Sequence, residues 1–199
     1  LAERGRRVVL LEAGEVGGGA SGPNGGQAIH GLACAPGEIE SQLGLEAARQ
    51  VFGMSVEALD LIRQRCQRYR IDCDWRDGWL GVAVQPRKVR DLFADADHLA
   101  QTYGYPLQCI ERHELTRWID SPRVCAAVHD PRSGHLHPLK YSLGLADAAA
   151  GLGAQLHEHS PVLSISEGPR PVLRTAHGEV SATQVLLAGN VYLQGLQRQ

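Results

Sequence analysis

Short apolar runs alternate with longer amphipathic stretches along this chain. Apolar residues recur at three- and four-residue steps over residues 43–69 and 89–103, which predicts two amphipathic helices. A third helix is expected over residues 138–152, where a proline is followed by many leucines and alanines. The short apolar runs predict strands, which would cover residues 7–12, 79–84, 124–129, 155–157, 162–166, 172–175, 180–182 and 185–188.

Residues with turn chemistry separate these elements. The glycine-rich stretch 14–27 predicts an irregular loop, and the sequence DPRSG at 130–134 predicts a turn. A hairpin turn is expected at residues 177–178, and a short helix at 113–119. The order is strand, glycine loop, long helix, strand-rich middle, helix and strands. It predicts an α/β chain with an inserted α+β segment.

Composition narrows the classes of protein that fit. The chain has 199 residues, of which 43% are apolar and 21% charged, and its formal net charge is −2. The arginines are scattered, so nucleic acid is not an expected partner. No apolar run approaches the roughly 20 residues that cross a bilayer, so no membrane segment is expected. The five cysteines are odd in number and contain no CxxC, which favours reduced thiols and a cytoplasmic protein.

The first candidate for ligand binding is the acid that ends the first predicted strand. In a dinucleotide-binding βαβ unit, an acid at this position accepts hydrogen bonds from the ribose hydroxyls. Glu12 is that acid here, and the loop that follows would let backbone amides approach a phosphate or a ring system. The alternatives are a solvated acid and a flexible linker. These two features alone fit FAD and NAD equally well.

Two further motifs carry weaker signals. The run VLLAGN at 185–190 ends in small residues, as a strand does where a cofactor lies against its end, although a core strand explains it as well. The sequence SGHLHP at 133–138 holds two histidines, of which His137 precedes a predicted helix. No recognisable set of metal ligands accompanies them, so no metal is expected. His137 could instead orient a substrate or serve a structural role.

Together these segments resemble the D-amino-acid-oxidase-like FAD oxidoreductases. LAERGRRVVLLEAG is similar to the helix end, second strand and ribose acid of that family, and GGGASGPNGGQ to its flavin-proximal loop. YRIDCDW and GHLHP are most similar to a subgroup that oxidises gamma-glutamylputrescine. The resemblance implies FAD as cofactor, a C–N bond of an amine or amino acid as the point of oxidation, and O₂ as the electron acceptor.

The resemblance also implies roles for individual residues. Glu12 would bind the adenosine ribose, and His137 would lie near the substrate pocket with no catalytic role assigned to it. The other cofactor contacts would come from Ala13 at the adenosine end, from Ala20, Ser21, Gly25, Gly26 and Gln27 along the pyrophosphate and flavin, from Val162 at adenine, and from Ala188 and Gly189 packed against the cofactor.

The expected domains are discontinuous. Residues 1–70 and 138–199 would form an incomplete, Rossmann-like FAD-binding domain, and residues 71–137 an incomplete segment of the substrate domain. The family's GxGxxG would lie roughly ten residues ahead of Leu1, and its C-terminal part beyond Gln199. We therefore expect a piece of a longer enzyme. The alternative is a truncated or decayed copy that neither binds FAD nor catalyses a reaction.

Overall fold

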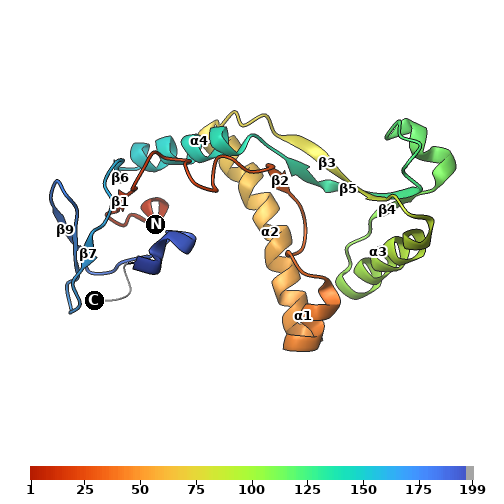
Figure 1. Cartoon of the computed structure of the whole chain (residues 1–199), viewed down its shortest axis with the longest axis horizontal. Coiled ribbons are helices and arrows are strands. Elements are labelled where there is room, and N and C mark those ends of the chain that lie inside the picture. The colour runs from red at the N-terminus through yellow and green to blue at the C-terminus, as the bar shows by residue number, and fades with distance from the viewer. Residues whose placement is uncertain (196–199) are drawn as a thin grey trace. The chain divides into compact units, whose positions relative to one another are not determined.

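The computed structural model describes residues 1–195 and divides them into two compact units. The first unit combines Leu1–Asn24 with the chain from Ser142 onward, and the second is Gly25–Tyr141. Figure 1 shows their elements along the chain. The expected split into an FAD-binding domain and a substrate domain places its boundaries elsewhere, at residues 70 and 138, and stays a prediction.

The first unit is built on a short parallel strand pair. β1 (Val9–Leu11) pairs with β6 (Gln155–His157), and Leu10 lies opposite Leu156. The chain reaches β6 through α4 (Pro138–Gly151), which begins with proline as the sequence predicts. Parallel strands need such a crossover, so residues far apart in sequence meet at the ends of β1 and β6.

The rest of the first unit is an antiparallel sheet and short helices. β7 (Ser164–Ile165), β8 (Val172–Arg174) and β9 (Glu179–Ser181) form the sheet, and the predicted hairpin turn joins β8 to β9. A short 3₁₀ helix, Ala2–Arg4, ends at Gly5 in the left-handed conformation, as expected of a helix stop. A second 3₁₀ helix covers Asn190–Gly195.

The strand expected at residues 185–188 is absent from the part of the chain that the structure describes. A strand requires a neighbour for its backbone groups. No described segment pairs with this run, and the side chain of Leu186 is 78% exposed. The apolar composition alone was therefore insufficient evidence for a strand.

The second unit is organised around one long strand, β5 (Ala126–His135). β3 (Arg76–Ala83) pairs antiparallel along one edge of β5. β2 (Gln27–Ala28) and β4 (Gln108–Ile110) pair with the other edge, near opposite ends of β5. Figure 1 shows β3 and β5 running side by side.

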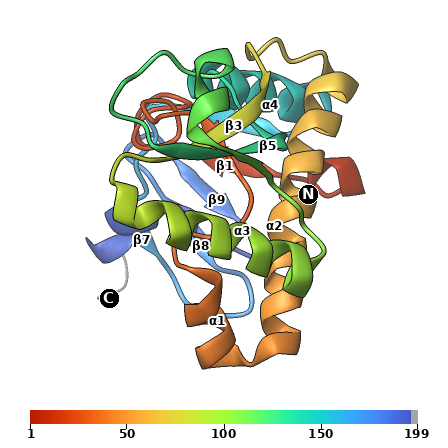
Figure 2. The ribbon, with the colours of Figure 1, turned by 90° about the vertical axis from the view of Figure 1, so that its right-hand side faces the viewer.

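Three α-helices accompany this sheet. α2 (Leu45–Tyr69) is the long amphipathic helix expected from the sequence, and α3 (Val89–Tyr103) has the predicted bounds. α1 (Pro36–Leu43) was not predicted and lies beside the start of α2 (Figure 2). Two 3₁₀ segments, Pro86–Lys88 and Arg112–Arg117, complete the unit. No helix in the described chain is long and apolar enough to cross a membrane.

The turn predicted for DPRSG is wrong, because this sequence lies inside β5. Pairing of Asp130 and Gly134 with β3, and the burial of Asp130 and Ser133, keep the segment in the strand against its local turn preference. The ladder is irregular here, because β5 has three residues (131–133) between these two pairs where β3 has only Gly78. Gly78 adopts a φ of +99°, which other residues rarely adopt.

A buried carboxylate forms the polar centre of the second unit. Asp130 is fully buried, and its Oδ2 accepts hydrogen bonds from Tyr105 (2.8 Å), Ser133 (2.5 Å) and Nδ1 of His30 (2.7 Å). Its Oδ1 accepts one from the backbone N–H of Arg132 at 3.0 Å. Burial alone would raise the pKa of Asp130, but these hydrogen bonds outweigh it and hold the pKa below its ordinary value.

A glycine in β5 gives the first prediction. A Cβ on Gly134 would lie 2.5 Å from the carbonyl oxygen of Arg76 and 2.6 Å from the ring of Trp75. Gly134→Ala should therefore lower the free energy of unfolding by about 1–3 kcal/mol. Gly53→Ala is the control, since a Cβ there meets nothing within 4 Å and should stabilise α2 by about 0.5–1 kcal/mol. Urea unfolding of both variants checks this, and equal effects would contradict it.

The second prediction concerns acid stability. A carboxyl whose pKa is lower in the folded chain stabilises the fold above its unfolded pKa of about 3.9, and that contribution fades as pH falls towards the folded value. Asp130 should therefore make unfolding easier as the pH drops below about 4. Asp130→Asn should lose about 1–3 kcal/mol at pH 7 and show a shallower acid dependence. Urea midpoints from pH 7 to pH 2 measure both, and parallel curves would argue against this role.

Candidate cofactor-binding site

Glu12 is fixed at the carboxyl end of β1, as the cofactor prediction requires. Its backbone N–H donates to the carbonyl of His157 at 2.9 Å, and its carbonyl accepts from the N–H of Ser160 at 2.8 Å. Its Oε1 accepts from the N–H of Gly14 at 2.8 Å. Glu12 is half-buried, and the backbone amide that holds its carboxylate belongs to Gly14, at the start of the glycine loop. This arrangement presents an acceptor at the strand end, where a ribose hydroxyl would donate.

The first part of the glycine loop is shaped by its own hydrogen bonds. The side-chain amide of Asn24 donates to the carbonyls of Ala20 (2.9 Å) and Ser21 (3.0 Å). Gly17 and Gly19 have positive φ, so this backbone turn depends on glycine. Ala20 and Ser21 are exposed. The side chain of Asn24 thus orders the loop itself.

Glu158 is a residue of this region that sequence reasoning missed. Its Oε1 accepts a hydrogen bond from the backbone N–H of Val16 at 2.6 Å, across 142 residues of sequence. His159 donates its N–H to the carbonyl of Gly14 at 2.8 Å. The segment after β6 therefore holds the start of the loop. No local pattern around Glu158 indicates this role, because it depends on the parallel pairing of β1 with β6.

The second part of the loop belongs to the other compact unit. Gly25 and Gly26 precede β2, and Gln27 is its first residue, with an exposed side chain. Gly26 is buried, and its carbonyl accepts from the N–H of Leu136 at 2.9 Å. A Cβ on Gly26 would overlap the carbonyl oxygen of Leu136. Close backbone packing therefore requires glycine here, independently of any cofactor.

His137 lies at the start of α4 and has structural contacts. Its N–H donates to the carbonyl of Cys73 at 2.7 Å, and its Nδ1 accepts from the N–H of Lys140 at 3.4 Å. The second contact satisfies a backbone donor of the first helical turn. The side chain is exposed. The role of His137 near a substrate stays a prediction, while its capping contact is seen directly.

The remaining predicted contacts lie in the first unit. Ala13 is exposed after β1, and Val162 is half-buried just before β7. Ala188 is exposed, and a Cβ on Gly189 would lie 2.7 Å from the side chain of Leu193. The structure thus brings Glu12 and the loop start to the segment after β6. Within residues 1–195, no group of three side chains is placed to hold a metal ion.

Comparison with known proteins identifies the family. The chain belongs to the DAO family of FAD-dependent oxidoreductases, whose profile matches residues 1–199. It is 38% identical over 200 residues to a probable oxidoreductase OrdL from Haemophilus influenzae, covering 100% of this chain and 46% of that protein. It is also 38% identical over 193 residues to gamma-glutamylputrescine oxidoreductase from Escherichia coli, covering 97% of this chain and 45% of that protein.

Solved structures share the fold. A glycine oxidase from Geobacillus kaustophilus matches with a TM-score of 0.72 and 24% identity, over 92% of this chain and 48% of that one. An L-amino acid deaminase from Proteus vulgaris matches with a TM-score of 0.78 and 20% identity, over 98% of this chain and 49% of that one. The expected α/β class and family are confirmed. The chain spans under half the length of the curated relatives named above.

The hydrogen bond from Val16 to Glu158 gives the third prediction. Glu158→Ala removes the acceptor, so the backbone amides of residues 15–17 should exchange with solvent at least about fivefold faster, because about 1 kcal/mol of protection is lost. Glu167→Ala is the matched control, since Glu167 is also exposed and lies outside this contact. Hydrogen–deuterium exchange with peptide resolution measures the difference. Equal exchange in the two variants would show that the loop is held by other contacts.

Proposed function

We propose that this protein acts as an FAD-dependent oxidoreductase on a C–N bond of an amine or amino acid. The observation that carries the proposal is the family match over residues 1–199, supported by Glu12 at the end of a parallel β1–β6 pair. A gamma-glutamylputrescine-like compound is the substrate we favour, because 38% identity to an enzyme of that name extends over 97% of the chain.

The residues present fit the adenosine half of FAD. A carboxylate at the end of a parallel strand supplies the acceptor that ribose hydroxyls need, and Oε1 of Glu12 is already oriented by Gly14. The neighbouring backbone turns at Gly17 and Gly19, where amides can approach a ligand without a side chain between. We propose that Ala13, Ala20, Ser21, Gly25, Gly26, Gln27, Val162, Ala188 and Gly189 complete the cofactor contacts.

The chemistry divides between cofactor and chain. FAD would supply the oxidant that removes a hydride from the carbon next to the substrate nitrogen, and the imine product would be hydrolysed. The residues of this chain would bind and orient: Glu12 would hold the ribose, and the glycine loop would supply backbone amides to the cofactor. We assign no proton transfer to His137. We propose O₂ as the electron acceptor. We also propose a cytoplasmic location, because all five cysteines are free thiols.

A spectroscopic experiment tests the proposal. The protein should bind FAD with the absorption bands of an oxidised flavin, and anaerobic gamma-glutamylputrescine should bleach those bands. Glycine and L-proline serve as alternative substrates, and readmitted air should restore the bands if O₂ is the acceptor. A protein that binds no flavin would favour the non-catalytic alternative. Flavin that no amine reduces would reject the proposed reaction.

The ribose acid gives the fourth prediction. Glu12→Ala removes the acceptor for two ribose hydroxyls and should weaken FAD binding by about 10- to 100-fold, as expected for hydrogen bonds to a charged group. Glu15→Ala is the control, because Glu15 lies in the same loop with a side chain that is 78% exposed. Calorimetric titration with FAD measures both. Equal affinities in the two variants would remove Glu12 from the cofactor site.

A further inference from the structure

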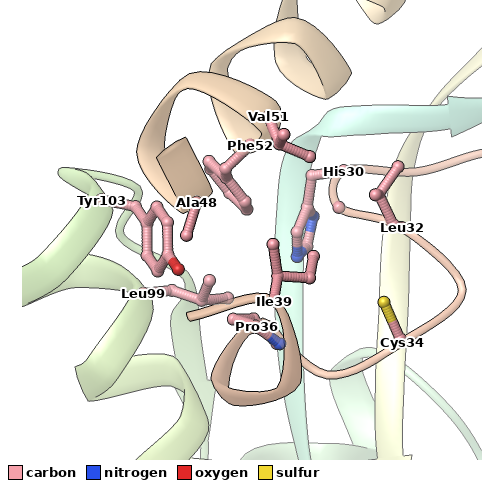
Figure 3. A pocket seen from close by; sticks show the side chains of 11 residues that line it. His30, Leu32, Cys34, Pro36, Ile39, Ala48, Val51, Phe52, Leu99 and Tyr103 are labelled. Atoms are coloured by element: carbon pink, nitrogen blue, oxygen red, sulfur yellow. The ribbon is translucent and has the colours of Figure 1, made fainter. Parts of the chain in front are cut away.

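A small cavity lies within the second unit, apart from the residues assigned to the cofactor. Its volume is about 160 Å³, it opens to solvent, and it is lined by the segment before α1, by α1 and α2, and by the end of α3 (Figure 3). Most of its wall is apolar. The apolar lining comes from Leu32, Pro36, Ile39, Ala48, Val51, Phe52 and Leu99.

One polar side chain in this wall is available to a ligand. The imidazole of His30 lines the cavity, and its side chain is only 10% exposed. Nδ1 of His30 is engaged with Asp130 at 2.7 Å, while Nε2 has no hydrogen-bond partner within residues 1–195. Tyr103 already donates its hydroxyl to Glu40 at 2.6 Å, and Cys34 adds an exposed thiol, which is only a weak hydrogen-bonding group.

The buried carboxylate orients the ring of His30. An ionised Asp130 accepts hydrogen bonds only, so Nδ1 of His30 is the donor in the hydrogen bond that joins them. Nε2 is the ring nitrogen left for a ligand, and a hydroxyl group, which can both donate and accept, can pair with it. A ligand in the cavity therefore needs a hydroxyl group to pair with His30.

The ring of His30 is also held rigidly. It packs against Tyr105 with ring centroids 4.8 Å apart, and against Trp79 edge-on at 5.7 Å. The hydroxyl of Ser133 accepts from the backbone N–H of His30 at 3.1 Å. Because backbone, ring and Nδ1 are all fixed, little conformational entropy is lost when Nε2 forms a hydrogen bond.

We propose that this cavity is a binding site for a neutral, compact aromatic compound carrying one hydroxyl group, with phenol as the simplest example. A cavity of about 150 Å³ lined by apolar side chains accommodates benzene, so the volume suits a single six-membered ring. None of the lining residues carries a carboxylate, and an ammonium ion would lose its hydration without a counter-charge. The inference is independent of the proposed oxidoreductase activity.

Ligand-observed NMR tests the proposal on the full chain. Fluorobenzene has the shape of phenol without the hydroxyl group, and its ¹⁹F signal should broaden on binding. Phenol should compete with a Kd on the order of 1 mM, and bind roughly three- to tenfold more tightly than fluorobenzene because of the hydrogen bond to His30. Equal affinities of the two compounds would overturn the proposal, as would the absence of saturable binding.

Two variants locate the site. His30→Phe keeps a ring but removes Nε2, so the preference for phenol should disappear while fluorobenzene still binds. Leu32→Trp should weaken both compounds more than about tenfold, because Leu32 is 55% exposed and a larger side chain there can fill the cavity without disturbing the core. Leu43→Trp is the matched control, 56% exposed on α1 and outside the lining, and should change neither affinity.

The variants also show how the proposal would fail. A preference for phenol that survives in His30→Phe would mean that another group recognises the hydroxyl. Unchanged binding in Leu32→Trp would place the compounds elsewhere on the protein. If His30→Phe does not fold, because Asp130 loses a buried partner, the comparison of Leu32→Trp with Leu43→Trp decides the question alone.

Discussion

The second unit depends on a carboxylate that has no access to water. Asp130 is buried in the central strand, and its two oxygens accept hydrogen bonds from a histidine, a tyrosine, a serine and one backbone amide. A buried charge is tolerated only when it is fully hydrogen-bonded, so these partners must take fixed positions. The segment before α1, the residues after α3 and the second half of β5 are thereby tied to one point. The guanidinium of Arg132 adds a cation–π contact, 3.4 Å from the centre of the Tyr105 ring.

The same constraint explains why the chain departs from its local preferences. DPRSG has the composition of a turn, yet the aspartate contributes more to folding by accepting four hydrogen bonds inside a strand than by capping a turn at the surface. Asp130 still accepts from the N–H two residues later, as aspartates in turns do. The local contact is retained, and the backbone around it is extended by pairing with β2 and β3. The turn composition still leaves a trace, because residues 131–133 of β5 lie opposite the single residue Gly78 of β3.

The sequence predicted the features that depend on neighbouring residues and missed those that depend on contacts between distant parts of the chain. The bounds of α3 and β6, and the hairpin between β8 and β9, were predicted correctly because periodicity and turn chemistry are local. The position of Glu12 at the end of β1 was predictable too, because a short apolar run that ends in an acid before glycines is a local pattern. His30 and Asp130 are 100 residues apart, and Glu158 meets Val16 across 142. Neither contact has a sequence signature. α1 was missed because it is short and contains few apolar residues.

Acids in this chain repeatedly hold backbone amides. Glu12 accepts from Gly14, Glu158 from Val16, and Asp130 from Arg132. In each case a carboxylate fixes a segment that the backbone ladder alone would leave without a partner. Residues committed in this way are poorly suited to proton transfer, because giving up the charge would release the segment. The three carboxylates thus serve as fixed acceptors that set the course of the backbone around them.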